Sequence, residues 1–305
     1  MVPVREEALL PGAAAPPRWY SHGLNRLAVY RVGAAVARVL PRVLRLRAAQ
    51  AVAAAAAGRF SDEGAAVRAT LARIVDDATP ARLDALVLEL FQNFAVCFTD
   101  LITTNRAKGT EGLLANTEGV EHLAAAERLG RGLVVVTAHL GNWELGGRLL
   151  ARTVTRPTHV VVAPEQDPGV EHFLRGNGGP VRFVTRTAPL DVLPLIAALR
   201  RNEVVALQGD RALGGRGDLR HAFFGVPAPF PLGPFILARA ARAPVLPAFC
   251  LLRADRRYTI ALGEPWTVPP GGEPEALARW VSVLEAMVRR HPTQWFNFYD
   301  VWRTC

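Results

Sequence analysis

Short apolar runs alternate with helical segments from about residue 115 onward, and this alternation constrains the fold more than any other feature of the chain. The runs are rich in valine and other strand-forming residues. The expected strands occupy residues 132–138, 158–163, 181–185, 203–208, 245–251 and 258–262. The expected helices occupy residues 143–153, 190–201, 234–242 and 273–290. Continuous apolar strands separated by helices are typical of a sheet that is covered on both faces. We therefore predict an α/β fold with a mixed, mostly parallel sheet flanked by helices.

The chain before residue 115 has a different pattern. Residues 1–20 are rich in proline and alanine, and we expect them to be irregular. Residues 21–114 have the spacing of helices, with breaks expected near Pro41, Gly58 and Pro80. Residues 115–305 form the predicted α/β domain. No repeat or low-complexity linker separates the two regions, so we expect the helical part to lie beside the sheet.

The composition excludes several classes of protein. Half of the residues are apolar, and the 26 glycines and 23 prolines have no repeat, which excludes a disordered, collagen-like or small disulfide-rich chain. The three cysteines have no metal-binding spacing, so we expect a reducing compartment and no metal site. Lysine and arginine total 36 and only Lys108 is a lysine, a bias typical of GC-rich coding, so arginine abundance alone indicates no function.

Positive charge is concentrated near the N-terminus. No acidic residue occurs between Ala8 and Phe60, and the arginines of this stretch are Arg18, Arg26, Arg31, Arg38, Arg42, Arg45, Arg47 and Arg59. Four of them, Arg31, Arg38, Arg42 and Arg45, fall within about 60° on a helical wheel. Valines and leucines lie mostly away from this stripe. A basic amphipathic helix suits an anionic membrane surface.

This basic region has two other interpretations. The helix could pack on its own domain with its arginine face in solvent. Binding of nucleic acid is not expected, because no basic patch is interleaved with aromatic residues. The longest uncharged stretch nearby, residues 48–58, is shorter than the roughly 20 apolar residues of a spanning helix.

The strongest candidate for a catalytic group follows the first expected strand of the α/β region. His139 is the first ionisable residue after residues 132–138, at the strand end where α/β proteins bind ligands. Glu144 follows five positions later, in the first turn of the next expected helix. Two interpretations follow: Glu144 hydrogen-bonds one nitrogen of the His139 ring, so that the other nitrogen acts as a general base, or the segment is a helix-capping loop with a structural histidine. Gly141 permits the turn, and Asn142 is placed to cap the helix.

Three further segments leave alternatives open. Asp210 and Arg211 follow another expected strand, and Arg211 either binds a phosphate or carboxylate or forms an internal ion pair. Residues 223–230 are apolar and rich in turn-forming residues, and they either line a groove for an acyl chain or form a packed loop. The aromatic segment 294–302 belongs either to a membrane interface or, at least in part, to the core.

These segments together resemble one family. "GRGLVVVTAHLGNWELGG" (130–147) resembles the His-x4-Asp/Glu signature of the bacterial lipid A biosynthesis acyltransferases, within the lysophospholipid acyltransferase-like superfamily. "LQGDR" (207–211), residues 223–249 and "HPTQWFNFYDVW" (291–302) follow in the same order. The resemblance spans roughly residues 20–302.

The resemblance implies an O-acyltransferase that works at the cytoplasmic face of the bacterial inner membrane. It implies transfer of a fatty acyl group from acyl carrier protein or coenzyme A to a hydroxyl of a lipid or glycolipid, without a metal or other cofactor. His139 and Glu144 would be catalytic. Asn142, Asp210 and Arg211 would contact substrate, as would Arg175, which lies where family members often have an arginine.

The sequence also departs from the family pattern. Family members that act on lipid A usually have Pro-Glu-Gln-Trp with a basic run near the C-terminus, whereas residues 292–295 are Pro-Thr-Gln-Trp without that run. An acceptor other than the anionic lipid A precursor therefore stays open. No Pro-Glu-Gly-Thr block is present, which argues against a glycerol-phosphate acceptor. A thioesterase that uses the same His–Glu pair with water is the alternative activity; the chain has no Gly-x-Ser-x-Gly motif.

Overall fold

The computed structural model describes residues 27–104, 110, 112–150, 154, 156–163, 165, 167–175, 181–185, 192–212 and 217–302. The predicted irregular segment 1–20 and Cys305 lie outside these ranges.

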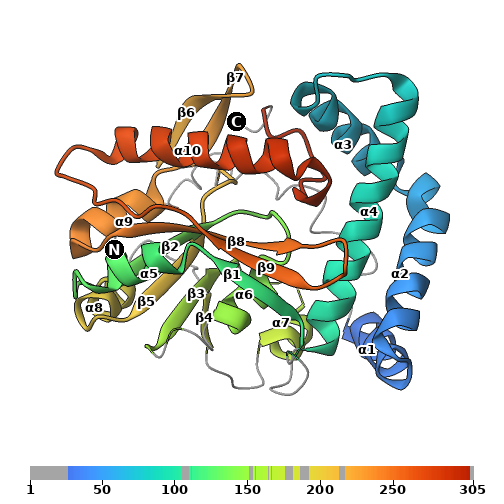
Figure 1. Cartoon of the computed structure of the whole chain (residues 1–305), viewed down its shortest axis with the longest axis horizontal. Helices are drawn as coiled ribbons and strands as arrows, with labels where there is room; N and C mark the ends of the chain where they lie inside the picture. Colours follow the sequence, from blue (N-terminus) through green and yellow to red (C-terminus); the bar gives the residue numbers. More distant parts are fainter. Residues whose placement is uncertain are drawn as a thin grey trace, which may run out of the picture.

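A seven-stranded sheet forms the centre of the structure (Figure 1). Its strands are β1 (Leu114–Glu118), β2 (Leu133–Thr137), β3 (Thr158–Val162), β4 (Val181–Thr185), β5 (Val204–Gln208), β8 (Val245–Leu252) and β9 (Tyr258–Leu262), in the order β1-β9-β8-β2-β5-β3-β4. Only β8 and β9 pair antiparallel; the other pairs are parallel. The predicted mixed, mostly parallel sheet is confirmed. Strand β1 was not predicted, because a polar edge strand has no continuous apolar run.

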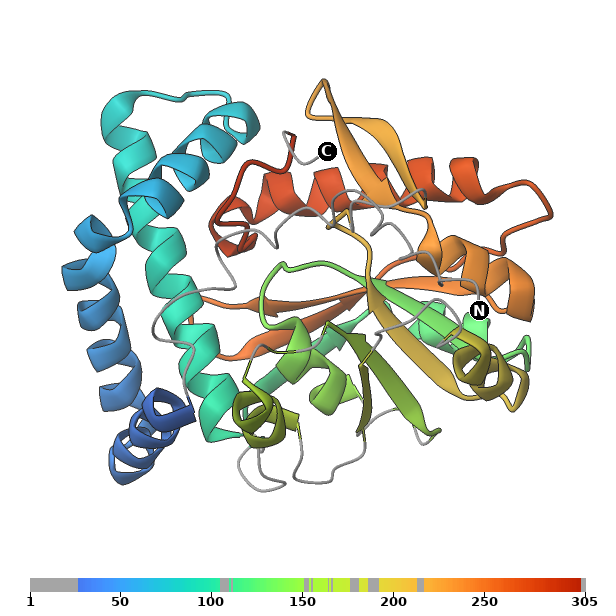
Figure 2. The same cartoon turned by 180° about the vertical axis from the view of Figure 1, so that it is seen from behind.

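Helices cover both faces of this sheet (Figures 1 and 2). On one face lie α8 (Leu193–Arg200), α9 (Gly233–Ala241) and α10 (Glu273–Arg290). On the other lie α5 (Val120–Glu127) and α6 (Trp143–Leu150), with α7 (Pro168–Arg175) against the N-terminal helices. Close approach fixes α6, because a Cβ on Gly146 would lie 2.7 Å from the Cβ of Cys250 on β8.

The N-terminal region is helical, and its breaks lie where the sequence predicts them. The elements are α1 (Leu27–Val39), α2 (Arg42–Ala56), the 3-10 helix η2 (Ala57–Arg59), α3 (Ser61–Ile74) and α4 (Pro80–Thr103). Pro41 separates α1 from α2, and Pro80 opens α4, where its missing N–H costs nothing. Among the described residues, α4 alone has the length and hydropathy of a membrane span, but half of its most apolar window is buried inside the protein.

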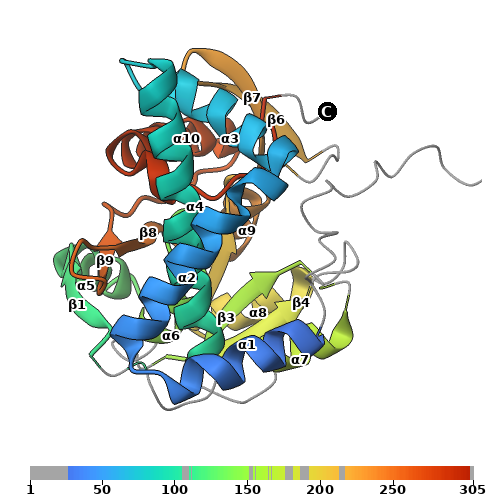
Figure 3. The ribbon, with the colours of Figure 1, turned by 90° about the vertical axis from the view of Figure 1, so that its right-hand side faces the viewer.

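Helices α1 and α2 expose apolar residues, and the described arginines of the stripe divide between solvent and the protein interior. Figure 3 shows both helices in front of α4. Their exposed large side chains, which we name the α1–α2 apolar face, are Val32, Val36, Val39, Val43, Leu44 and Val52. Arg42 instead points toward α4 and pairs with Asp100, and Arg45 is partly buried. The fully buried carboxylate of Asp100 requires a cation, which Arg42 supplies, whereas Arg31 of the same stripe is exposed.

The two aromatic segments belong largely to the core. Residues 218–231 form an antiparallel hairpin of β6 (Asp218–Phe223) and β7 (Val226–Pro231), so this segment is neither of the two alternatives, groove or packed loop, that its sequence left open. Phe223 is buried; its ring lies edge-on to that of Trp295 and stacks on that of Trp302. Phe298 packs instead against Phe94 of α4.

Candidate active site

His139 lies just beyond the carboxyl end of β2, as the sequence predicts. Its backbone is held on both sides: its N–H donates to Asp210 Oδ2 (3.0 Å), and its carbonyl accepts from the N–H of Phe296 (2.8 Å). The side chain is 18% exposed, and its ring lies edge-on to that of Trp143, with centroids 5.7 Å apart. The imidazole is therefore fixed in place and still within reach of solvent.

Asp210 is the carboxylate that contacts this imidazole. It follows β5, the parallel neighbour of β2, where Thr137 and Gln208 are in register. Asp210 Oδ1 lies 2.8 Å from His139 Nδ1, and Oδ2 also accepts from Trp295 Nε1 at 3.0 Å. The side chain of Asp210 is completely buried. An ionised Asp210 accepts a hydrogen bond from Nδ1–H, so the proton of the neutral ring stays on Nδ1 and the lone pair is on Nε2.

The charges around this pair favour that state. Burial and the positive charge of Arg211 lower the pKa of the His139 imidazole from its ordinary value, against the opposing effect of Asp210. Burial alone would raise the pKa of the Asp210 carboxyl, but His139, Arg211 and the Trp295 N–H hold it well below its usual range. At neutral pH the pair is a carboxylate and a neutral imidazole, which is the form of a general base.

Glu144 has a different partner from the one predicted. Its Oε1 accepts from Arg175 Nε at 3.2 Å, and Arg175 Nη2 also contacts Glu165 at 2.9 Å. The predicted contact of Glu144 with the imidazole is wrong, because the first turn of α6 directs this side chain toward α7. All three side chains are nearly buried. Burial opposes the charge of Arg175, but Glu144 and Glu165 raise its pKa above the ordinary value, so it stays cationic.

Asn142 points into the protein and not toward a substrate site. Its Nδ2 donates to the carbonyl of Cys97 at 2.9 Å and to Tyr258 Oη at 3.2 Å. Its Oδ1 accepts from the N–H of Leu145 at 3.4 Å, so the predicted capping of α6 is confirmed. With these contacts made and the residue 4% exposed, the predicted contact of Asn142 with substrate has no support in the geometry.

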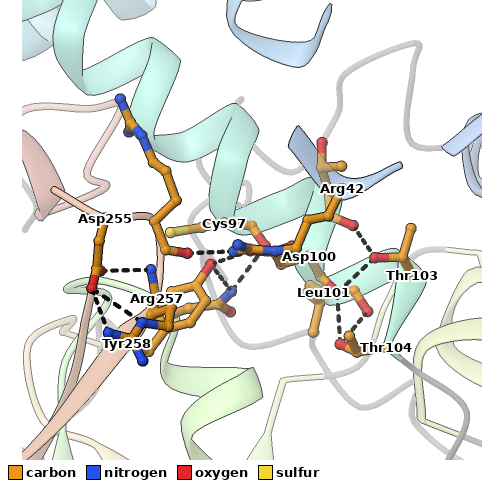
Figure 4. Close-up of polar contacts among 12 residues, drawn as sticks. Arg42, Cys97, Asp100, Leu101, Thr103, Thr104, Asp255, Arg257 and Tyr258 are labelled. Atoms are coloured by element: carbon orange, nitrogen blue, oxygen red, sulfur yellow. Dashed lines mark hydrogen bonds and ion pairs between the residues drawn. The ribbon is translucent and has the colours of Figure 1, made fainter. Parts of the chain in front are cut away.

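A buried polar chain continues from Asn142 to the N-terminal helices (Figure 4). Tyr258 Oη donates to Asp100 Oδ2 at 2.9 Å, and Arg42 Nε and Nη2 donate to the two oxygens of the same carboxylate. Arg42 also binds the carbonyl of Arg256. The chain thus joins α2, α4 and β9 to the residue that caps α6, next to the loop that holds His139.

Tyr258→Phe should lower the free energy of unfolding by about 1–3 kcal/mol, because the change removes one donor to a buried carboxylate and one acceptor of Asn142. Urea denaturation measures the effect. Tyr30→Phe is the matched control, since Tyr30 packs edge-on between Phe98 and Phe173. An equal loss of unfolding free energy in the two variants would show that the hydrogen bonds of Tyr258 add nothing to stability.

Arg211 contacts the C-terminal segment. Its Nε donates to Asn297 Oδ1 at 2.9 Å and its Nη2 to the carbonyl of Phe296 at 2.8 Å. The same segment supplies Trp295 to Asp210. Of the two roles left open by the sequence, these contacts favour the structural one: Arg211 ties the loop after β5 to the chain end and adds positive charge beside His139.

An apolar slot lies between the sheet and α6. Its cavity volume is about 40 Å³, and most of its lining is apolar. The lining residues are Val135, Thr137, Trp143, Gly146, Gly147, Leu150, Thr158, Val160, Val204, Ala206, Gln208, Ala248, Phe249 and Cys250. Trp143 contributes to this lining and also contacts the His139 ring, so the slot begins next to the candidate base.

Comparison with known proteins decides the family. The family model of the bacterial lipid A biosynthesis acyltransferases matches residues 24–304. The chain belongs to this family. Similar proteins include a phosphatidylinositol mannoside acyltransferase of Mycobacterium tuberculosis (strain H37Rv), 30% identical over 200 residues, with 60% of each chain covered.

Two proteins of Escherichia coli (strain K12) are also similar. The lipid A biosynthesis palmitoleoyltransferase is 24% identical over 191 residues, covering 62% of this chain and 61% of the relative. The lipid A biosynthesis lauroyltransferase is 26% identical over 189 residues, covering 61% of each chain. The matched region thus spans about three fifths of the length of these relatives.

The positions of this acyltransferase-family site could be predicted from the sequence, but not all of its pairings. His139 and Asp210 each follow their strand by two residues, and the strands are neighbours in register. That equal offset was the available signal for the pair. It needed the strand order, which a single sequence does not contain. Trp295 gave no signal, because it reaches Asp210 from 85 residues away.

Proposed function

We propose that the chain transfers a fatty acyl group from an acyl thioester to a hydroxyl of a lipid or glycolipid. One observation carries the proposal: the His139 imidazole, hydrogen-bonded to the buried Asp210 carboxylate, stands at the start of an apolar slot. A base beside an apolar slot suits a reaction between a hydroxyl and a thioester whose acyl chain is buried. Acyl carrier protein and coenzyme A are both proposed as carriers of that thioester.

The residues suggest the following reaction. His139 Nε2 takes the proton of the acceptor hydroxyl, whose oxygen attacks the thioester carbonyl carbon. The new C–O bond forms, the C–S bond breaks, and the imidazolium returns the proton to the leaving sulfur. Asp210 holds the ring and stabilises its transient positive charge. Arg175, the last residue of α7, forms ion pairs with Glu144 and Glu165. It is a candidate for contact with an anionic part of the acceptor.

The acceptor is proposed as a lipid or glycolipid of the lipid A precursor type. A glycolipid other than lipid A is the second candidate. It is favoured by the mannoside acyltransferase at 30% identity and by the C-terminal segment, which lacks the basic run expected for a strongly anionic acceptor.

Purified protein, incubated with labelled acyl carrier protein or acyl-coenzyme A and a membrane lipid extract, tests the function. A new acylated lipid, identified by mass spectrometry, supports acyl transfer and names the acceptor. Release of free fatty acid alone would indicate the thioesterase alternative. Absence of turnover with either donor would argue against both activities.

Membrane binding is proposed to occur through the α1–α2 apolar face, at the cytoplasmic side of the bacterial inner membrane. Isolated exposed apolar residues are ordinary, but this group lies on two consecutive helices and is accompanied by exposed Arg31 and Arg47. Apolar side chains with flanking arginines suit the boundary of an anionic bilayer.

Val39→Gln combined with Val43→Gln should weaken binding to vesicles containing anionic phospholipid by about tenfold or more, because two apolar side chains no longer enter the bilayer. A vesicle sedimentation assay measures it. The matched control is Val120→Gln with Leu129→Gln, which changes one exposed apolar residue at the start of α5 and one just after its end. If both pairs reduce binding equally, the α1–α2 apolar face is not the membrane-binding surface.

A further inference from the structure

The slot contains one polar group that its packing does not explain. Gln208 Nε2 is inaccessible to solvent and has no hydrogen-bond acceptor among the described residues. Its neighbours in the lining include Val135, Val204 and Ala206. Burying an amide N–H without an acceptor costs free energy that an aliphatic side chain of similar size would avoid. A ligand that brings an acceptor into the slot would remove that cost.

Gln208 directly precedes the segment that carries one member of the catalytic pair. Thr137 and Gln208 end β2 and β5 and line the slot, and His139 and Asp210 follow them by two residues each. Gly209, between Gln208 and Asp210, faces the opposite side, where an added Cβ would meet Trp280 of α10. Thr137 and Gln208 are in register, and Asp210 and His139 are hydrogen-bonded one step beyond. The four residues form two adjacent rows at the strand ends.

Gln208 is separated by one strand step from Asp210, whose carboxylate contacts the candidate base. One step of two residues along a strand is about 6.5 Å, a distance that the side chain of glutamine can largely span. The attacking oxygen must lie about 3 Å from His139 Nε2 and about 3–3.5 Å from the carbonyl carbon. An acyl chain in the slot therefore passes Gln208 at or near its carbonyl end.

We propose that Gln208 Nε2 donates a hydrogen bond to the carbonyl oxygen of the acyl thioester. The proposal rests on the proposed function and names a catalytic residue for it. As the acceptor oxygen attacks, the carbonyl π electrons move onto the carbonyl oxygen, and the Gln208 N–H stabilises that charge. When the carbonyl re-forms, the thiolate leaves with the C–S electrons and takes the proton from His139. A fixed donor aimed at such an oxygen acts without reorganisation.

Gln208→Met tests the proposal, because methionine keeps the length of the side chain and removes its donor. We expect kcat/KM for the acyl donor to fall by about 10²–10³-fold, mostly in kcat, with the thermal midpoint unchanged or raised. Gln208→Glu, which replaces the donor by an acceptor, should be at least as impaired. A Gln208→Met protein that keeps kcat within twofold of the wild type would overturn the proposal.

A pair of unreactive donor analogues isolates the hydrogen bond. One is a methylene ketone, in which CH₂ replaces the sulfur, and the other is a thioether without the carbonyl. The wild type should bind the ketone roughly tenfold more tightly than the thioether, and Gln208→Met should bind the two equally. An equal preference for the ketone in both proteins would exclude Gln208 as the donor.

A third experiment compares 3-hydroxyacyl and unsubstituted acyl donors. It distinguishes a hydrogen bond to the thioester carbonyl from recognition of a hydroxyl on the acyl chain. Gln208→Met could change only the preference between 3-hydroxyacyl and unsubstituted donors. That result would mean that the amide binds the hydroxyl of the acyl chain and not the thioester carbonyl, and the proposal would be wrong. Failure of the proposed function itself has a different signature: the wild type would transfer no acyl group and bind neither analogue.

Discussion

His139→Ala should lower the rate of acyl transfer by at least about 10²–10⁴-fold, because it removes the side chain that takes the acceptor proton. The fold should be kept, since the imidazole is partly exposed at a strand end and its main-chain hydrogen bonds to Asp210 and Phe296 do not need the ring. The labelled-donor assay measures the rate, and thermal unfolding checks the fold. A folded His139→Ala protein with near wild-type turnover would falsify the mechanism.

The wild-type pH profile provides an independent check on the same residue. The base works when neutral, so the rate should rise with pH as His139 loses its proton. Burial and Arg211 lower the pKa of this imidazole from its ordinary value of 6.5, so the midpoint of the rise should lie below that pH. A midpoint well above that value would mean that another group, or a protonated His139, limits the reaction.

Asp210→Asn should lower turnover by about 10³–10⁴-fold, in the manner of carboxylate-to-amide changes in catalytic triads. The amide of asparagine can donate to Nδ1 and so favours the tautomer whose lone pair is on the wrong nitrogen. Its oxygen can still accept from Trp295 Nε1, so the packing of the C-terminal segment should survive. Turnover and near-ultraviolet circular dichroism measure the two effects.

Glu144→Gln is the matched comparison, because the sequence motif singles out Glu144 whereas the structure pairs Asp210 with the imidazole. Glutamine at 144 keeps an oxygen for Arg175 and leaves Nδ1 untouched, so we expect a smaller loss than in Asp210→Asn. The double change His139→Ala with Asp210→Asn should be no slower than His139→Ala alone, since the two act as one unit. A larger loss in Glu144→Gln than in Asp210→Asn would return the role of the carboxylate partner to Glu144.

The chemistry of the site could be predicted from the sequence further than its contacts could. His139 was identifiable because a polar ionisable residue directly after an apolar run marks the carboxyl end of a strand. The motif with Glu144 indicated the family. Yet a spacing of five residues does not determine a side-chain direction. In the structure the first turn of α6 carries Glu144 to Arg175, and the imidazole receives a carboxylate from a different strand.

The amphipathic N-terminal helices show the same division. The sequence determined that α1 and α2 are helices broken at Pro41. It did not determine which face is outward. Asp100, buried on α4, accepts from Arg42, and an ionised carboxylate without a partner in the interior is too costly. Arg42 therefore points inward, while the valines are left in solvent together with Arg31 and Arg47.

Local pattern thus determined the class of fold, the positions of most strands and helices, the helix breaks and the candidate catalytic histidine. These follow from periodicity, proline geometry and the ends of apolar runs, all of which act over a few residues. Strand order decided the rest. Only when β5 lies beside β2 does Asp210 meet His139, and only when the chain end folds back does Trp295 complete the carboxylate's hydrogen bonds. Such contacts join residues far apart in the chain, and no local spacing encodes them.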